Sequence, residues 1–262
     1  LFTAVLPFGL AGAASATAIS QSLGGIIPLF YFGRRNSSRL RLCRTVLDWK
    51  ALLKACTNGS SELMSNISMS IVGMLYNAQL LHYAGEDGVA AYGVLMYVSM
   101  IFMAIFIGYS TGVAPVVSFH FGADGREELR SLYRKSIVII LSASAAMLGL
   151  AEALARPLSA VFVGYDPDLF RMTVGAFGIY SFSFLFSGIA IFGSAFFTAL
   201  NDGLTSALIS LLRTLVFQVA AVLIFPLIWG IDGIWLSIVA AEVMAAVVTL
   251  AFLGGKRRRF HY

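Results

Sequence analysis

Residues 234–253 read IWLSIVAAEVMAAVVTLAFL, a stretch in which only Glu242 is charged. The hydrocarbon core of a bilayer is about 30 Å thick, and a helix of about 20 apolar residues crosses it. Lipid offers no hydrogen-bond partners to the backbone, so a spanning segment must be a helix or a strand of a closed barrel. Barrel strands alternate apolar and polar residues, which this segment does not do. The stretch therefore predicts a transmembrane helix.

Six further segments of the chain show the same pattern. Hydropathy and helix-breaking residues place them near residues 10–32, 60–83, 89–114, 136–155, 173–199 and 206–228. The composition agrees, because 59% of the residues are hydrophobic and 12% are charged, against about 45–50% and 25% in soluble domains. We therefore predict an all-α, polytopic helical membrane protein of about seven transmembrane helices.

Basic residues are concentrated in alternate connections of these helices. Lys and Arg near helix ends are retained on the cytoplasmic side of a membrane. The opposite connections carry only Arg156 and Arg171, and Arg213 lies within a helix. The other basic residues fall on one side: Arg34, Arg35, Arg39, Arg41, Arg44, Lys50, Lys54, Arg126, Arg130, Arg134, Lys135, Lys256, Arg257, Arg258 and Arg259. We therefore expect a multi-pass protein of the inner (plasma) membrane with a cytoplasmic C-terminus, and no nucleic-acid partner.

The segment from Asp48 to Lys54 mixes apolar and basic residues just ahead of the helix at 60–83. Asp is a residue type that caps helix N-termini, and the mixed polarity is typical of a helix at a membrane surface. We predict an interfacial turn of helix with Trp49 at headgroup level. Cys43 and Cys56 lie in or beside this basic region, in a reducing compartment, so we expect neither a disulfide nor a metal site.

The chain contains an internal similarity. Gly9-Leu10-Ala11-Gly12 opens one predicted helix, and Gly230-Ile231-Asp232-Gly233 opens another 221 residues later. Gln21 and Glu242 then occupy equivalent places, and both helices end in glycine followed by basic residues. Transporters are often built from such repeats, with their sites between the halves. The alternative is that Gly-x-x-Gly turns recur by chance.

Three motifs are similar to those of one transporter family. Residues 109–123, YSTGVAPVVSFHFGA, resemble the Gly-x-x-Pro-x-x-x-x-x-x-Gly-Ala stretch that closes a helix in multidrug and toxic compound extrusion (MATE) transporters. Residues 59–62 with Asn66, and residues 193–201 with Arg213-Thr214, resemble a bacterial branch of that family.

The resemblance implies a transporter of two six-helix lobes and twelve helices, with no resident cofactor. Residues 1–45 would be the last helix of the N-terminal lobe and the basic inter-lobe loop. Residues 46–255 would be the six-helix C-terminal lobe, and residues 256–262 a basic cytoplasmic tail. We therefore expect a fragment that lacks most of its N-terminal lobe. One departure is that the acid many members place ten residues after Gly59 would fall at Met69.

The helix near residues 60–83 carries a polar stripe. At about 100° per residue its members lie within roughly 80° of one another; they are Gly59, Glu62, Asn66, Ser70, Gly73 and Asn77. Such a stripe faces protein or water rather than lipid. It either joins helices together, as small and polar residues commonly do, or lines a cavity in which Glu62 meets a cation.

Charged residues inside a bilayer are costly and are functional candidates by default. Glu242 lies near mid-membrane, and Arg213 can reach an acid on a neighbouring helix, where pairing offsets both desolvation costs. We expect a structural pair, with a gating or proton-relay role as the alternative. Glu152 lies four residues before Arg156, so we expect a helix-surface pair there.

The sequence leaves three functions open. The first is a secondary antiporter, not an enzyme, that exchanges organic cations or amphipathic drugs for protons or Na⁺ by alternating access. Its candidate substrate- and ion-binding residues are Glu62, Asn66, Ser70, Asn77, Glu242 and Arg213. The second is a lipid-linked oligosaccharide flippase of the same superfamily, which would need more basic residues in its cavity. The third is a seven-helix receptor, which leaves the internal similarity unexplained.

Overall fold

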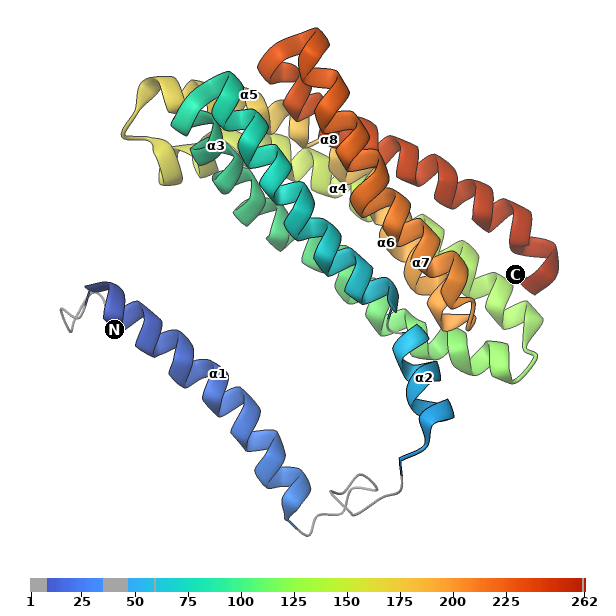
Figure 1. Cartoon of the computed structure of the whole chain (residues 1–262). Coiled ribbons are helices and arrows are strands. Elements are labelled where there is room, and N and C mark those ends of the chain that lie inside the picture. Colours follow the sequence, from blue (N-terminus) through green and yellow to red (C-terminus); the bar gives the residue numbers. More distant parts are fainter. Residues whose placement is uncertain (1–8, 35–46, 59, 261) are drawn as a thin grey trace. The chain divides into compact units, whose positions relative to one another are not determined.

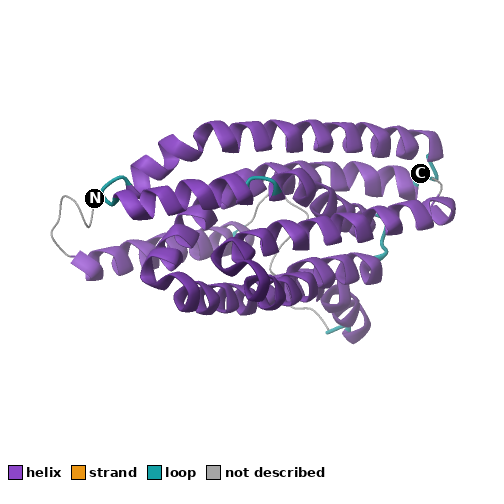
Figure 2. Ribbon diagram, turned by 90° about the horizontal axis from the view of Figure 1, so that it is seen from above, coloured by secondary structure: helices purple, strands orange, loops and turns teal. Residues whose placement is uncertain are grey.

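The computed structural model describes residues 9–34, 47–58, 60–260 and 262, and these are almost entirely helical (Figure 2). They divide into two compact units, Leu1–Leu52 and Leu53–Tyr262. In the first unit α1 spans Gly9–Gly33, which confirms the helix predicted at residues 10–32. Helix α2, Trp49–Asn58, begins in the first unit and ends in the second.

The second unit consists of one continuous helical bundle, coloured cyan to red in Figure 1. Its elements in chain order are α3 (Ser60–Gly122), α4 (Arg126–Val163), α5 (Pro167–Tyr180), α6 (Ser183–Ala199), α7 (Gly203–Leu211), the π-helix η1 (Leu212–Val216) and α8 (Phe217–Phe260). No strand occurs in the part of the chain that the structure describes. The prediction of an all-α fold is confirmed.

Three segments of the described residues are long and apolar enough to cross a membrane: Asn66–Gly122, Arg126–Val163 and Gly203–Arg257. The pair α5 and α6, bent by 49°, adds a fourth if it is one span. Helix α1 is not among these segments of the described residues. The protein is therefore a polytopic helical membrane protein.

Two glycines divide the longest helices. A straight helix of 63 residues such as α3 would be about 95 Å long, far more than a bilayer needs. Gly85 interrupts α3 with φ 65° and ψ −153°, and Gly230 interrupts α8 with φ 58° and ψ −132°. A side chain is strained at such angles, so glycine is needed. Each helix is thus a hairpin, with arms at residues 60–84 and 86–122 in α3, and 217–229 and 231–260 in α8.

These hairpins correspond to the predicted helix pairs, but the loops are shorter than predicted. We expected turns at residues 85–88 and 230–233 and a loop over residues 156–171. The structure uses one glycine for each hairpin, and α4 continues to Val163 before α5 begins at Pro167. The basic residues Arg126 and Arg130 also lie within α4 rather than in a loop. Continuing the helix through these residues keeps their backbone N–H and C=O groups hydrogen-bonded within the helix.

Helix α6 is the centre of the second unit, packing against α3, α4, α7 and α8. Two glycines let neighbours approach it closely. A Cβ at Gly188 would lie 2.8 Å from Cε1 of Phe106, and one at Gly193 would overlap Cγ2 of Thr249. Small residues at such contacts are the usual means by which membrane helices pack.

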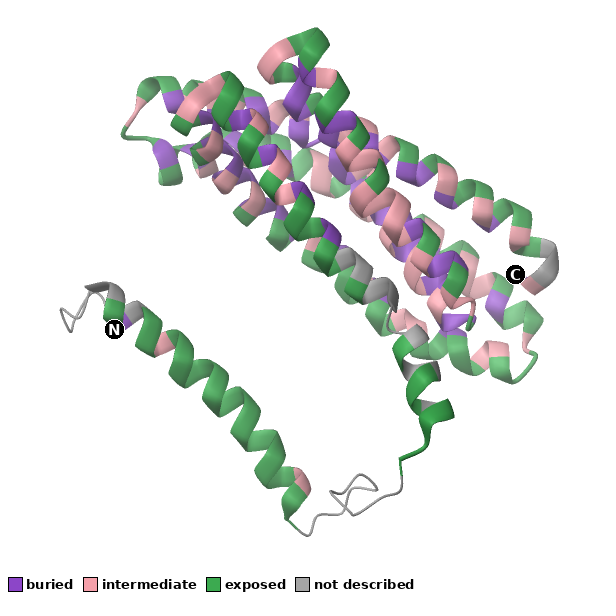
Figure 3. Cartoon of the chain, viewed as in Figure 1, coloured by how far each residue is buried: buried purple, intermediate pink, exposed green. Residues whose placement is uncertain are grey.

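Large apolar side chains also cover much of the outer surface of the second unit, where Figure 3 shows exposed and buried residues alternating along the helices. Val161 and Leu227 are each 79% exposed. In a soluble protein such a surface would be unfavourable, whereas in a bilayer it contacts lipid tails.

Candidate functional site

The predicted polar stripe lies on the first arm of α3. Asn66, Ser70 and Asn77 are exposed, and no atom lies within 4 Å of a Cβ built at Gly73. Glu62 belongs to α3, but its side chain lies outside the described residues, as does Gly59. The opposite face of this arm packs into the second unit, which we call the lobe, through Ser68, Val72, Tyr76 and Leu80. The stripe is therefore on the surface of the second unit and not inside it.

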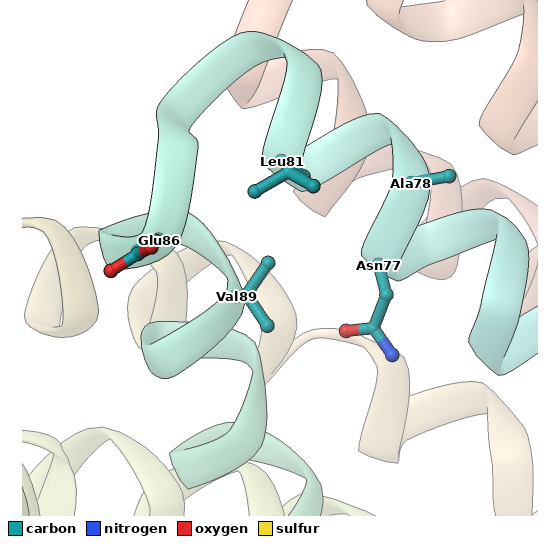
Figure 4. A pocket seen from close by; sticks show the side chains of 5 residues that line it. All are labelled: Asn77, Ala78, Leu81, Glu86 and Val89. Atoms are coloured by element: carbon teal, nitrogen blue, oxygen red, sulfur yellow. The ribbon is translucent and has the colours of Figure 1, made fainter.

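An open hollow of about 320 Å³ lies between the two arms of α3, close to the turn at Gly85 that joins them. It is lined by Asn77, Ala78, Leu81, Glu86 and Val89, and Figure 4 shows that both arms contribute these side chains. Asn77 thus joins the polar stripe to the hollow, at the end of the lobe where the hairpin reverses.

Arg213 and Glu242 form an ion pair inside the lobe. Nε of Arg213 donates to Oε2 of Glu242 at 2.9 Å, and their side chains are only 18% and 5% exposed. Arg213 lies in η1, a π-helical turn, and Glu242 on the second arm of α8. π-Helical turns often mark functional sites. The predicted contact between Arg213 and an acid on a neighbouring helix is confirmed.

A second polar network lies between α3 and α8. The hydroxyl of Tyr76 donates to Oε1 of Gln218 at 2.8 Å and shares a 2.8 Å hydrogen bond with Ser237. The ring of Tyr92 stacks on that of Tyr76 at 5.6 Å. This network joins α3 to both arms of α8, and its two α8 residues lie close in sequence to Arg213 and Glu242.

Sequence reasoning missed this network, although a signal was present. Gln218 lies five residues after Arg213, and Ser237 lies five residues before Glu242. Positions related in this way face one another in an antiparallel hairpin. Arg213 with Glu242 and Gln218 with Ser237 share one midpoint, between residues 227 and 228, so this pattern placed Gln218 near Ser237 but did not point to Tyr76.

The end of the lobe at which α3 turns into α4 and α6 into α7, and at which α8 ends, is here called the basic end. Nζ of Lys256 donates to Oδ2 of Asp202 at 2.6 Å and to the hydroxyl of Thr205. It also lies 5.8 Å from the ring centre of Phe197. Burial raises the pKa of Asp202, but hydrogen bonds from Lys256 and Thr205 outweigh burial and lower the pKa below its ordinary value. The sequence did not indicate this cluster.

Residues 256–260, expected in a basic tail, continue α8. The last residue, Tyr262, is buried, and its hydroxyl donates to the carbonyl oxygen of Leu253 at 2.8 Å. Nε of Arg257 in turn donates to the carbonyl oxygen of Tyr262 at 3.0 Å. These contacts bring Tyr262 back onto the end of α8.

The expected pair of Glu152 and Arg156 is wrong. Glu152 accepts a hydrogen bond from the hydroxyl of Ser181, and Arg156 is not its partner among the ion pairs of the described residues. Ser181 lies at the bend between α5 and α6. The acid bonds there because the bend brings a hydroxyl within reach, which spacing along α4 does not reveal.

Comparisons with known proteins agree with this architecture. The family MatE matches residues 63–224. A multidrug export protein, MepA of Staphylococcus haemolyticus (strain JCSC1435), is 22% identical over 260 residues, which are 97% of this chain and 57% of the relative. The chain thus spans little more than half the length of that relative.

Solved structures show the same fold. A MATE transporter in complex with MaL6 matches with a TM-score of 0.87 and 22% identity, over 99% of this chain and 59% of that one. The outward-facing conformation of a multidrug resistance MATE family transporter matches with a TM-score of 0.85 and 23% identity, over 99% and 58%. Since the family match covers more than half of its residues, the chain belongs to the MatE family of membrane transporters.

Proposed function

We propose that this chain is the C-terminal portion of a MATE-type secondary antiporter that exports organic cations or other amphipathic drugs in exchange for protons or Na⁺. Its relatives are multidrug export proteins whose length exceeds that of this chain. The proposal includes an N-terminal lobe facing this one, a substrate path between the lobes, and alternating access by rocking of the two.

The exposed face of the first arm of α3 is the observation that carries this proposal. Asn66, Ser70 and Asn77 offer polar contacts there, while Met69 and Met74 are 66% and 73% exposed. A surface that is both polar and methionine-rich is costly in lipid tails but suits a wet cavity that binds varied apolar cargo. In this proposal Glu62, earlier on the same arm, is the exchangeable acid that meets the cation.

The buried pair Arg213–Glu242 is the second part of the proposed mechanism. A proton or a Na⁺ ion that binds Glu242 competes with Arg213 for the same carboxylate. Release of Arg213 would alter the contact between η1 and the second arm of α8, and so would couple ion binding to the packing of these helices. The ion pair thereby serves as a gate, while the α3 face provides the drug contacts.

The same pair weakens the flippase alternative. A lipid pyrophosphate needs unpaired basic residues in the cavity, and Arg213 is already bound to Glu242.

We further propose that the protein lies in the plasma membrane with its basic end in the cytoplasm, because Lys and Arg concentrate on that side.

The test uses the full-length transporter in everted membrane vesicles with a fluorescent organic cation. We expect Glu62→Gln and Glu242→Gln each to reduce ion-driven uptake at least about tenfold, by removing a group that must exchange a cation. The matched control is Glu128→Gln, a change of the same kind in the first turn of α4, which should leave uptake unchanged. If both test variants keep full transport and ion coupling, these acids are not the coupling groups and the mechanism is wrong.

A further inference from the structure

Helix α2 is a short helix that no part of the transport mechanism above uses. It is ten residues long, and the backbone N–H of Lys50 donates to Oδ1 of Asp48 at 2.9 Å. Asp48 thereby caps the helix, as the sequence predicted. Only Gly59 separates the end of α2 from the start of α3, and α3 contains the apolar segment Asn66–Gly122. The helix therefore lies immediately before the chain enters the membrane.

The sequence of α2 divides it cleanly into two faces. At about 100° per residue, Trp49, Leu52, Leu53 and Cys56 fall within roughly 100° of one another. Lys50, Lys54, Thr57 and Asn58 fall within a similar arc on the other side. A strongly amphipathic helix with Trp and Leu on one face and lysines on the other is typical of helices that lie in a membrane interface.

The apolar face of α2 is largely exposed in the part of the chain that the structure describes. Trp49 is 70% exposed, Leu53 is 68% exposed and Leu52 is 42% exposed. Cys56 is also exposed. A short amphipathic helix is stabilised mainly by the free energy of burying its apolar face. These side chains contribute no such free energy while they are in water, so a partner is needed.

We propose that α2 lies along the bilayer surface and binds anionic lipid. The apolar face enters the boundary between headgroups and acyl chains, with Trp49 at the depth that tryptophan prefers. Lys50 and Lys54 contact the anionic headgroups. Lipid fits better than a protein partner because α2 leads directly into a spanning helix and because its polar face is cationic. Five further arginines lie at positions 34, 35, 39, 41 and 44.

The first test measures the depth of each face in the full-length protein in lipid vesicles. Cys43 is replaced by Ser, and a nitroxide label is attached at Cys56. The matched probe is Asn58→Cys in a chain that also carries Cys56→Ser. We expect the label at position 56 to collide with oxygen and to be shielded from an aqueous nickel complex, and the label at 58 to behave in the opposite way.

Two results would overturn the proposal. A label at position 56 that is shielded from both reagents is covered by protein rather than lipid. A label at 56 that meets the nickel complex as often as the label at 58 lies in water. Neither result depends on transport, so the outcome is independent of the antiporter mechanism.

The second test asks whether the lipid must be anionic. Vesicles of phosphatidylcholine alone are compared with vesicles that also contain phosphatidylglycerol. A lysine near an anionic surface contributes about a fivefold preference for the membrane-bound state. Lys50→Gln and Lys54→Gln should therefore each reduce the ratio of membrane-inserted to released α2, as read from the label at position 56, about fivefold. This reduction should occur only in vesicles that contain anionic lipid. An equal ratio in both lipids and in both variants would contradict the role of the lysines.

Discussion

At the scale of single residues, Arg213 and Glu242 illustrate how costly a buried charge is. Removing one partner of a buried pair leaves the other charge unsatisfied, at a cost of about 3–5 kcal/mol. We expect Arg213→Gln to lower the thermal midpoint of the detergent-solubilised protein clearly. Arg171→Gln serves as the control, since Arg171 and Asp168 pair with side chains 77% and 87% exposed and such pairs contribute little.

The double variant Arg213→Met with Glu242→Leu separates stability from function. Apolar residues of similar size often replace a buried pair without loss of stability, so its midpoint should return close to that of the wild type. Equal midpoints for Arg213→Gln and Arg171→Gln would show that the buried pair is not formed in solution.

Asp202 predicts a dependence of stability on pH. Its pKa is lower in the folded protein than in the unfolded chain because Lys256 and Thr205 bind the carboxylate. The stabilisation is therefore complete above about pH 5 and is lost as the pH falls through the ordinary value near 3.9 toward the folded value. We expect the thermal midpoint to fall over this range, and to fall less in Asp202→Asn. Asp168→Asn, on an 87% exposed carboxylate, is the control that should retain the wild-type profile.

At the scale of elements, the contact between α6 and α8 depends on a missing side chain. A Cβ at Gly193 would overlap Cγ2 of Thr249, and overpacking of a core typically costs about 1–3 kcal/mol. We expect Gly193→Ala to destabilise the protein, and Thr249→Ser to restore stability in the double variant, because serine lacks that methyl group but keeps the hydroxyl. Thermal unfolding of the four proteins forms a double-mutant cycle that measures this coupling.

The control for that cycle is Gly149→Ala in α4. No atom lies within 4 Å of a Cβ built at Gly149, and alanine is the better helix former, so stability should stay the same or rise. Additive effects of Gly193→Ala and Thr249→Ser would mean that α6 and α8 do not pack in this way.

At the scale of the whole molecule, the chain covers 57% of the length of its MepA relative, and the polar face of α3 is exposed. In the proposed mechanism this chain supplies only one wall of the cavity, and a single wall cannot alternate between two sides of a membrane. We therefore expect the 262-residue chain alone in liposomes to transport no fluorescent organic cation under an imposed proton or Na⁺ gradient. The full-length transporter in parallel liposomes is the positive control, and gradient-driven transport by the chain alone would refute the two-lobe mechanism.

The sequence by itself determined that this is an all-helical membrane protein, where its main hairpins lie, and which family it resembles. Those conclusions rest on local properties: runs of apolar residues, glycines at the hairpin turns, and motifs such as residues 109–123. The pairing of Arg213 with an acid was also predictable, because a charge in lipid has few alternatives.

Only the tertiary structure decided which polar residues meet and which side each helix presents. The bonds of Tyr76 with Gln218 and Ser237, of Glu152 with Ser181, and of Lys256 with Asp202 join residues 29 to 161 positions apart. Helical periodicity shows that a polar stripe shares one face, but not whether that face points into the lobe or out of it. That choice depends on the packing of the whole bundle, because burial is a property of neighbours and not of the segment itself.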